Sequence, residues 1–119
     1  MIFLDTNILI EYLKGNREII KSFSLDELFI NDIVLMELYQ GARNKSDLNF
    51  ITKEVSVFKI LKTNNEIMKL ATLLVKKYNL SHNMKIMDAI IASTVLVYDI
   101  KLMTLNKKDF AYLNDIKLI

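Results

Sequence analysis

The chain has 119 residues, of which 52% are hydrophobic and 25% charged, and 16 basic against 14 acidic residues give a formal net charge of only +2. This length predicts one domain over residues 1–119, and the apolar content excludes a chain that is disordered throughout. The absence of cysteine excludes disulfide frameworks, thiolate zinc sites and cysteine nucleophiles, while the small net charge lacks the basic excess that marks many nucleic-acid binders.

The opening residues predict a buried strand followed directly by a helix. Residues 1–4 are wholly apolar, which is typical of a strand covered on both faces of a parallel sheet, and Asp5 stands at its carboxyl end. Thr6 or Asn7 is expected to cap a helix that ends at residues 14–16. The opening lacks the basic region of a signal peptide, and no apolar run reaches the roughly 18 residues of a membrane span, so we expect a cytoplasmic protein.

The middle of the chain predicts alternating helices and strands. Asn31 and Asp32 are favourable N-cap residues for one helix, and Ser46 is expected to cap another. The expected elements in this part are a short helix over residues 17–23, a strand over 27–30, helices over 33–43 and 46–54, and a less regular strand over 55–61.

The second half contains the two most distinct helical patterns. Residues 64–78 place apolar side chains on one face and lysines largely on the other, whereas the helix over residues 89–98, which Asp88 opens, is apolar on nearly every side and is expected to be buried. Apolar strands alternating with helices predict an α/β fold with a parallel sheet covered on both faces. The remaining expected elements are a loop at 81–83, a strand over 102–105, a loop or single turn at 106–110 and a closing strand over 116–119.

Three carboxylates stand in apolar surroundings, namely Asp5 after the first strand, Glu37 inside a helix and Asp88 at the start of the buried helix. Ligands of parallel sheets bind beyond the carboxyl ends of the strands, which is where Asp5 lies. A buried carboxylate is costly unless it is paired or metal-bound, and no basic residue stands beside any of the three. The carboxylates are therefore either capped separately or share a cation, and oxygen ligands alone favour Mg²⁺ or Mn²⁺.

Each carboxylate also has a simpler interpretation. Asp88 could cap its helix, and Asp5 could end its strand in a turn. Glu37 could pair with Arg43 or with a lysine. Convergence of all three by chance is harder to sustain than any one of these alternatives.

Four short motifs follow one another along the chain. They are Leu4-Asp5-Thr6-Asn7, the segment ELYQGA from Glu37 to Ala42, the segment DAIIAS from Asp88 to Ser93, and the segment TLNKKDF from Thr104 to Phe110. Together they resemble the four motifs of PIN domains and, within that family, the VapC-like toxin ribonucleases of type II toxin–antitoxin systems. Four motifs in this order are specific, and the resemblance covers essentially the whole chain.

This resemblance implies a three-layer α/β/α sandwich with a mostly parallel central sheet. It also implies a Mg²⁺- or Mn²⁺-dependent endoribonuclease that hydrolyses RNA phosphodiesters with metal-activated water. The implied partners are an RNA substrate, a cognate antitoxin protein that inserts a segment into the active-site groove, and a second copy in a homodimer. The apolar residues of the early helices that we consider for such interfaces are Ile8, Leu9, Tyr12, Leu38 and Tyr39. A second set, expected either in the core or at an interface, consists of Met36, Tyr39, Met68 and Met87.

The resemblance further implies roles for individual residues. Asp5 and Asp88 would contact the metal directly, and Glu37 would do so directly or through water and could act as a general base. In the fourth motif we place Asn106 near the metal as a neutral neighbour and Asp109 as the carboxylate. This departure from the family pattern concerns the binding of a second metal ion and leaves the first metal site unchanged. Residues expected to support the carboxylates or contact phosphate are Thr6, Asn7 and Thr104, and those expected to bind RNA are Arg43, Lys107 and Lys108.

Two other interpretations compete with this one. Asn106, standing where a carboxylate is expected, favours a non-catalytic PIN-like module that binds RNA or a protein. A phosphoacceptor domain is disfavoured, because such domains place the acceptor after a central strand and Asp5 comes too early in the chain. His82 is the only histidine, and we expect it in a loop without a catalytic role.

Overall fold

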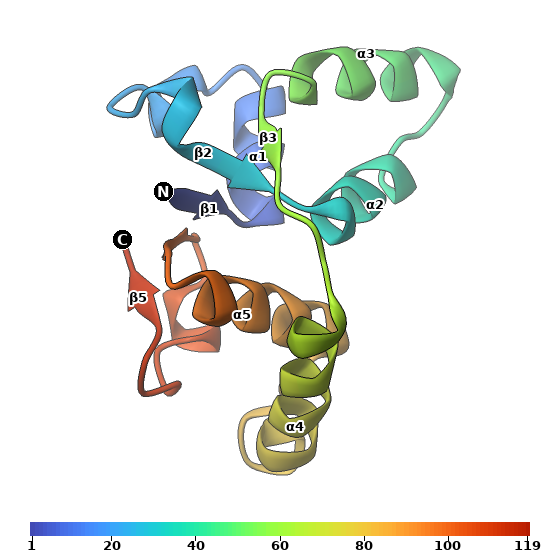
Figure 1. Cartoon of the computed structure of the whole chain (residues 1–119). Coiled ribbons are helices and arrows are strands. Elements are labelled where there is room, and N and C mark those ends of the chain that lie inside the picture. The colour runs from blue at the N-terminus through green and yellow to red at the C-terminus, as the bar shows by residue number, and fades with distance from the viewer.

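A five-stranded parallel sheet forms the centre of the computed structural model, which describes all residues from 1 to 119 (Figure 1). The strands are β1 (Ile2–Leu4), β2 (Leu28–Ile30), β3 (Lys59–Ile60), β4 (Lys101–Met103) and β5 (Lys117–Leu118), arranged in the order β3-β2-β1-β4-β5. The first strand is central, because Ile2 lies opposite both Leu28 of β2 and Lys101 of β4. The predicted parallel sheet is thereby confirmed.

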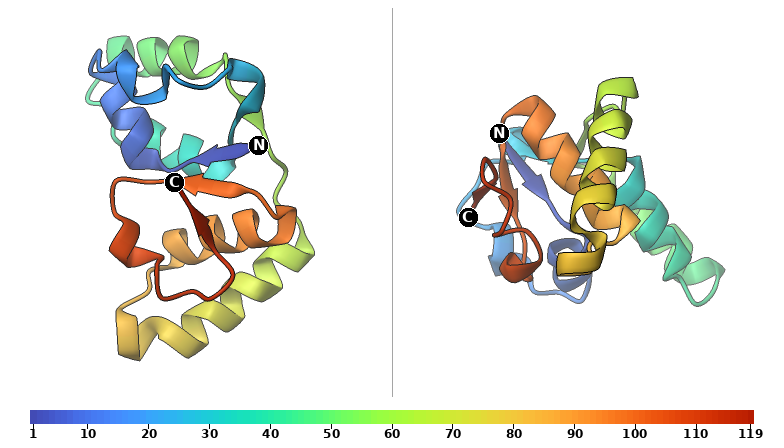
Figure 2. Two further views of the ribbon diagram at one scale, coloured as in Figure 1. Left: turned by 90° about the vertical axis from the view of Figure 1, so that its left-hand side faces the viewer. Right: turned by 90° about the horizontal axis from the view of Figure 1, so that it is seen from below.

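Five α-helices surround this sheet, namely α1 (Thr6–Leu13), α2 (Asp32–Gln40), α3 (Lys45–Val55), α4 (Asn65–His82) and α5 (Ile86–Tyr98). Helices α4 and α5 pack together on one side of the sheet, and α1 and α3 lie on the other side (Figure 2). Helix α2 contacts α1, α3 and α5 and so joins the two sides. The α/β architecture with helices on both sides is the one expected from the sequence.

The hydrophobic core is centred on β1 and α5. All three residues of β1 are buried, and so is the continuous run from Ala89 to Val95 in α5. A strand buried on both faces and a helix buried on nearly every side are what the uniform apolar patterns predicted. No helix is both long enough and apolar enough to cross a membrane.

Several element boundaries differ from the expected ones. Asp5, not Thr6 or Asn7, caps α1, and Asn44, not Ser46, caps α3, because those side chains accept the first free backbone N–H groups. The expected strand over residues 55–61 is reduced to β3, since Val55 still belongs to α3.

The expected loop at residues 81–83 is also wrong in part. Helix α4 continues through Ser81 and His82 and ends only at Asn83, which adopts a left-handed conformation with φ of 53°. Helix α5 begins at Ile86, so that Asp88 lies within its first turn and does not cap it. These shifts bring His82 and Asp88 to the same end of the α4–α5 pair.

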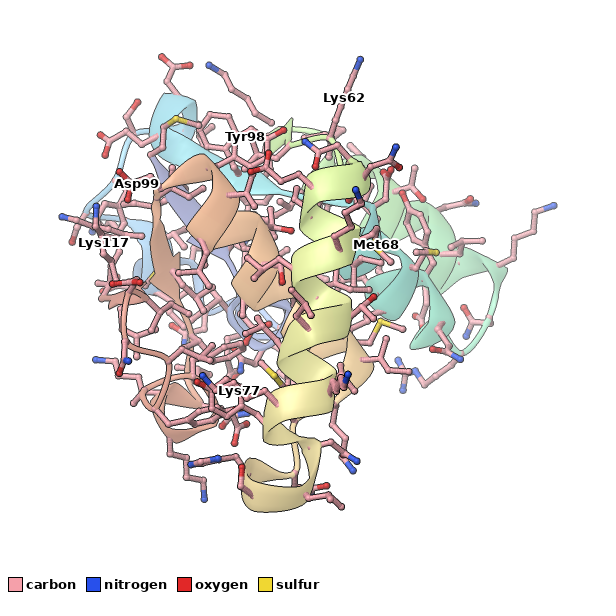
Figure 3. All side chains as sticks on the ribbon, turned by 60° about the horizontal axis from the view of Figure 1, so that its bottom comes forward. Lys62, Met68, Lys77, Tyr98, Asp99 and Lys117 are labelled. Atoms are coloured by element: carbon pink, nitrogen blue, oxygen red, sulfur yellow. The ribbon has the colours of Figure 1, made fainter.

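The opposite end of α5 is fastened by polar contacts (Figure 3). The hydroxyl of Tyr98 donates a hydrogen bond of 2.9 Å to the carbonyl of Lys62, just before α4. Asp99, which follows α5, forms an ion pair of 2.8 Å with Lys117 of β5. These contacts hold α5 to α4 and to the edge of the sheet.

The apolar residues considered for interfaces divide into two groups. Ile8, Leu9, Tyr12 and Leu38 are buried in the core, so the proposal that they form an interface is wrong for those four. The side chains that remain exposed at the surface are Met36, Tyr39, Met68 and Met87, which excludes a core role for them.

Candidate active site at the carboxyl edge of the sheet

Asp5 and Thr104 come together because each follows a strand, and the two strands are neighbours. Asp5 comes directly after β1 and Thr104 directly after β4, which pair in parallel. The backbone N–H of Asp5 donates to the carbonyl of Met103, 3.0 Å away. The parallel register therefore places the two side chains at the same edge of the sheet.

The Asp5 carboxylate is almost completely buried and is held by three hydrogen bonds. Its Oδ1 accepts the backbone N–H of Thr6 at 2.8 Å, and its Oδ2 accepts the Thr104 hydroxyl at 2.8 Å and the Asn7 amide at 3.3 Å. Burial raises the pKa of Asp5, and although these hydrogen bonds oppose the shift, the pKa remains above its ordinary value. The side chain is thus fixed in place while its negative charge has no cationic partner within ion-pair distance.

Asn7 and Thr104 tie the start of α1 to the segment after β4. The Oδ1 of Asn7 accepts the backbone N–H of Leu105 at 3.2 Å, and its amide also donates to the Thr104 hydroxyl at 3.3 Å. The Thr104 hydroxyl oxygen accepts the backbone N–H of Asn106 at 3.1 Å. Both residues therefore support the Asp5 carboxylate, whereas the Asn106 side chain is exposed and hydrogen-bonds to no other residue.

Glu37 reaches the same region from α2. Its Oε1 accepts the hydroxyl of Thr6 at 2.8 Å, so that Thr6 contacts two of the proposed carboxylates. The alternative pairing of Glu37 with Arg43 does not occur, because Arg43 forms its ion pair with Asp47 at 2.8 Å. Glu37 is half-buried and has no salt bridge.

Asp88 experiences the negative charges of all the other candidate carboxylates. Burial raises its pKa to about 6, helped by the charges of Asp5, Asp109 and Glu37, while Lys85 opposes the shift. The charge of Asp109 also raises the pKa of Asp5. The charges of Asp5, Glu37 and Asp109, which stand on separate segments of the chain, therefore all act on Asp88.

The chemistry of these side chains fits a divalent cation. No three carboxylate or histidine side chains converge closely enough to enclose a metal ion by themselves. Mg²⁺ does not need such a cage, because it usually keeps several waters and binds through one or two carboxylates together with substrate phosphates. Carboxylates without an ion-pair partner, of which Asp5 and Glu37 are held by hydrogen bonds from Thr6, are suitable ligands for such an ion.

Two hollows border the carboxylates. A pocket of about 150 Å³ is lined by Asp88 and Asp109 together with His82, Asn83, Met84, Lys85 and Tyr112. A larger groove of about 460 Å³ lies between α1, α2 and α3 and includes Glu37 and Arg43. Lys107 and Lys108 are exposed in the short helical turn that carries Asp109.

Lys85 and Tyr112 are site residues that the sequence analysis missed. A usable signal existed for Lys85, which stands three residues before Asp88 at the start of the expected helix, about one helical turn away, whereas Tyr112 lies beyond the turn that carries Asp109 and had no such signal. His82 was expected in a loop but stands in the last turn of α4 and borders the acidic pocket.

The pKa of Asp88 predicts how stability depends on pH in metal-free buffer. The folded protein binds this proton more tightly than the unfolded chain, with a pKa of about 6 against 3.8, so the stabilisation is complete below pH 3.8 and is lost as the pH rises through 6. The expected loss is about 1 to 2 kcal/mol, less than the full shift implies, because the side chain is only half-buried. Urea unfolding between pH 4 and 7.5 in EDTA should show this decline, and Asp88→Asn should remove Asp88's share of it.

Comparison with known proteins identifies close resemblances along the whole chain. The family model of the PIN domain matches residues 2–115. The chain is 31% identical to ribonuclease VapC2 of Methanocaldococcus jannaschii, covering 99% of this chain and 92% of that protein. It is 28% identical to ribonuclease VapC of Rickettsia bellii, covering 99% of this chain and 94% of that protein.

Solved structures show the same resemblance in three dimensions. A toxin–antitoxin complex from Klebsiella pneumoniae matches with a TM-score of 0.81 and 27% identity, covering 100% of this chain and 96% of that chain. The VapBC-1 structure from nontypeable Haemophilus influenzae matches with a TM-score of 0.80 and 26% identity, covering 100% of this chain and 97% of that chain. The sheet order and the helices on both sides are therefore shared with these proteins.

Proposed function

The chain belongs to the PIN domain family, and on that premise we propose that it is the endoribonuclease toxin of a toxin–antitoxin pair, dependent on Mg²⁺ or Mn²⁺. The curated relatives are named ribonucleases, and the similar solved structures include a toxin–antitoxin complex. The observation that carries the proposal is that Asp5, Glu37 and Asp109 act with their negative charges on Asp88, while none of the four carboxylates has a basic partner in an ion pair. Such a group suits a divalent cation, and the cation in turn suits the phosphates of RNA.

In this proposal Asp5 and Asp88 hold the divalent ion, with Glu37 binding it directly or through water. A bound divalent ion would supply a lowered pKa for water and neutralisation of phosphate charge. The hydroxyl of Thr6 occupies Oε1 of Glu37 and leaves Oε2 free to accept a proton from the attacking water. Thr104 keeps the Asp5 carboxylate in position, so little reorganisation is needed when substrate arrives.

Asp109 completes the acidic group in this proposal, and Asn106 stands beside it as a neutral neighbour. Lys107 and Lys108, exposed in the same turn, would contact phosphates on one side of the cleaved bond. Arg43, whose side chain is 85% exposed beside the groove between α1, α2 and α3, would contact phosphates on the other side. These basic side chains would bind RNA locally, around an acidic centre, although the small net charge of the whole chain did not indicate a nucleic-acid binder.

The antitoxin and a second copy of the chain would use two different surfaces. The groove between α1, α2 and α3 combines apolar side chains, such as Leu38 and Phe50, with Glu37, which suits a peptide segment that blocks the active site. The exposed apolar side chains of α4 and α5, including Met68, Leu73 and Ile86, suit a homodimer contact. Because its substrate is cellular RNA, we place the protein in the cytoplasm.

The decisive test is cleavage of RNA by the purified chain with and without divalent ions. Mg²⁺ or Mn²⁺ should support cleavage, EDTA should abolish it, and adding excess ion should restore it. Induction of the gene should arrest growth, and coexpression of the protein encoded beside it should relieve the arrest. Retained RNA affinity without cleavage under any of these conditions would instead establish a non-catalytic binding module.

A further inference from the structure

Three aromatic rings gather at the rim of the acidic pocket. The imidazole of His82 is stacked on the ring of Tyr112, with ring centroids 4.0 Å apart and planes inclined by 18°. Tyr78, one turn earlier in α4, lies edge-on to His82 at 5.6 Å and tilted against Tyr112 at 5.0 Å. The last turn of α4 is thereby held against the segment that follows Asp109.

His82 is the outer member of this cluster. Its side chain is exposed, whereas Tyr78 and Tyr112 are partly buried beneath it. The hydroxyl of Ser81 lies 2.7 Å from Nδ1 of His82, which restricts rotation of the ring. The result is an aromatic ring that is held by a hydrogen bond and a stacking contact while part of its side chain remains exposed to solvent.

The Tyr112 hydroxyl is a second unusual feature of the cluster. It is buried and has no hydrogen-bond partner, and burial together with the charges of Asp88 and Asp109 raises its pKa. A buried donor without a partner is unfavourable, and phenylalanine would pack the same ring without that cost. Close packing of the protein alone therefore does not account for a tyrosine at this position.

The aromatic cluster shares a cavity with two of the four carboxylates of the proposed active site. His82 and Tyr112 line the pocket of about 150 Å³ together with Asp88 and Asp109, and Lys85 lines it as well. A phosphate bound at the carboxylates would thus bring the adjoining nucleoside to the aromatic rim. Bases of single-stranded RNA commonly stack on aromatic side chains, because every base offers an apolar ring surface.

We propose that His82, supported from behind by Tyr112, stacks on a nucleobase of the RNA next to the cleaved phosphate. This inference rests on the proposed ribonuclease function, and it makes His82 a substrate-positioning residue and not a proton donor or acceptor. The contact tolerates different bases and selects unpaired RNA, since a base within a duplex has no free surface to present.

Binding can be measured without cleavage in EDTA. Because His82 is the only histidine in the chain, the resonances of its two carbon-bound ring protons need no assignment. At fixed pH, a short single-stranded RNA should move both resonances upfield through the ring current of the stacked base. An abasic ribose-phosphate oligomer of equal length should cause no upfield shift. Equal shifts with both oligomers would overturn the stacking contact.

Three substitutions at His82 separate stacking from charge. His82→Ala should raise the KM for a short RNA about 10-fold with kcat changed less than 2-fold, and His82→Phe should restore KM to within about 3-fold of the wild type. His82→Lys should behave like His82→Ala. The reverse pattern, in which lysine restores KM and phenylalanine does not, would show a phosphate contact and overturn the proposal, as would three variants that all match the wild type.

The two proposals fail in different ways. An upfield shift specific to base-containing RNA in a protein that cleaves nothing would refute the ribonuclease and retain the nucleobase site. Metal-dependent cleavage that is unaffected by His82→Ala would refute the nucleobase site and retain the ribonuclease. Thermal unfolding of His82→Phe should match the wild type, because phenylalanine keeps the stack on Tyr112, whereas His82→Ala and His82→Lys should unfold at a slightly lower temperature.

Discussion

Replacing Asp88 with asparagine is expected to lower the rate of RNA cleavage about 1000-fold while making the metal-free protein more stable. The rate falls because a proposed metal ligand loses its charge, and about 4 kcal/mol of transition-state stabilisation corresponds to that factor. The stability rises because the substitution removes a half-buried charge that Asp5, Asp109 and Glu37 repel. Cleavage of a short RNA at saturating Mg²⁺ and urea unfolding at pH 7.5 in EDTA measure the two effects.

The opposite signs of these two effects distinguish a catalytic role from a structural one. A residue needed only for folding would lose activity and stability together. Asp99→Asn is a matched control, since it removes the same charge at the other end of α5, about 16 Å away along the helix. Asparagine also suits the left-handed conformation of that position, where φ is 54°, so activity should be unchanged. Wild-type activity in Asp88→Asn would refute the proposed metal site.

Replacing Thr104 with valine is expected to have the second largest effect. Valine keeps the shape of the side chain but removes the hydroxyl that donates to Asp5 at 2.8 Å and accepts the backbone N–H of Asn106 at 3.1 Å. Losing both hydrogen bonds should cost about 2 kcal/mol of unfolding free energy, although Oδ2 of Asp5 keeps its hydrogen bond from the Asn7 amide. Cleavage should fall about 10- to 100-fold, because the Asp5 carboxylate is no longer held in one orientation.

Thr63→Val provides the control for this prediction. The Thr63 hydroxyl is also buried but has no hydrogen-bond partner, so its replacement by a methyl group should leave stability unchanged or slightly raised and activity unaffected. Unfolding in urea and cleavage kinetics of both variants test the comparison. Equal stability losses in the two variants would show that the Thr104 hydrogen bonds contribute nothing specific.

Much of the architecture was predictable from local patterns of residues. The uniform apolar run of residues 1–4 indicated a central buried strand, and the uniformly apolar segment after Asp88 indicated a buried helix, because burial on every side leaves no polar face in the sequence. The boundaries were less predictable. Asn44 and Ser46 are both acceptable caps, and in the structure it is the Asn44 side chain that accepts the backbone N–H of Asp47 and starts α3.

The sequence by itself determined the chemical nature of the site, while the tertiary structure decided which residues share it. Asp5, Glu37 and Asp88 stood out because carboxylates in apolar segments need a reason to be there. The hydrogen bond from Thr104 to Asp5, the pocket that Asp88 shares with Asp109 and the stack of His82 on Tyr112 were decided by the fold. The physical reason is that residue type and periodicity are local properties, whereas contacts between residues nearly 100 positions apart, such as Asp5 and Thr104, exist only once parallel strands are aligned.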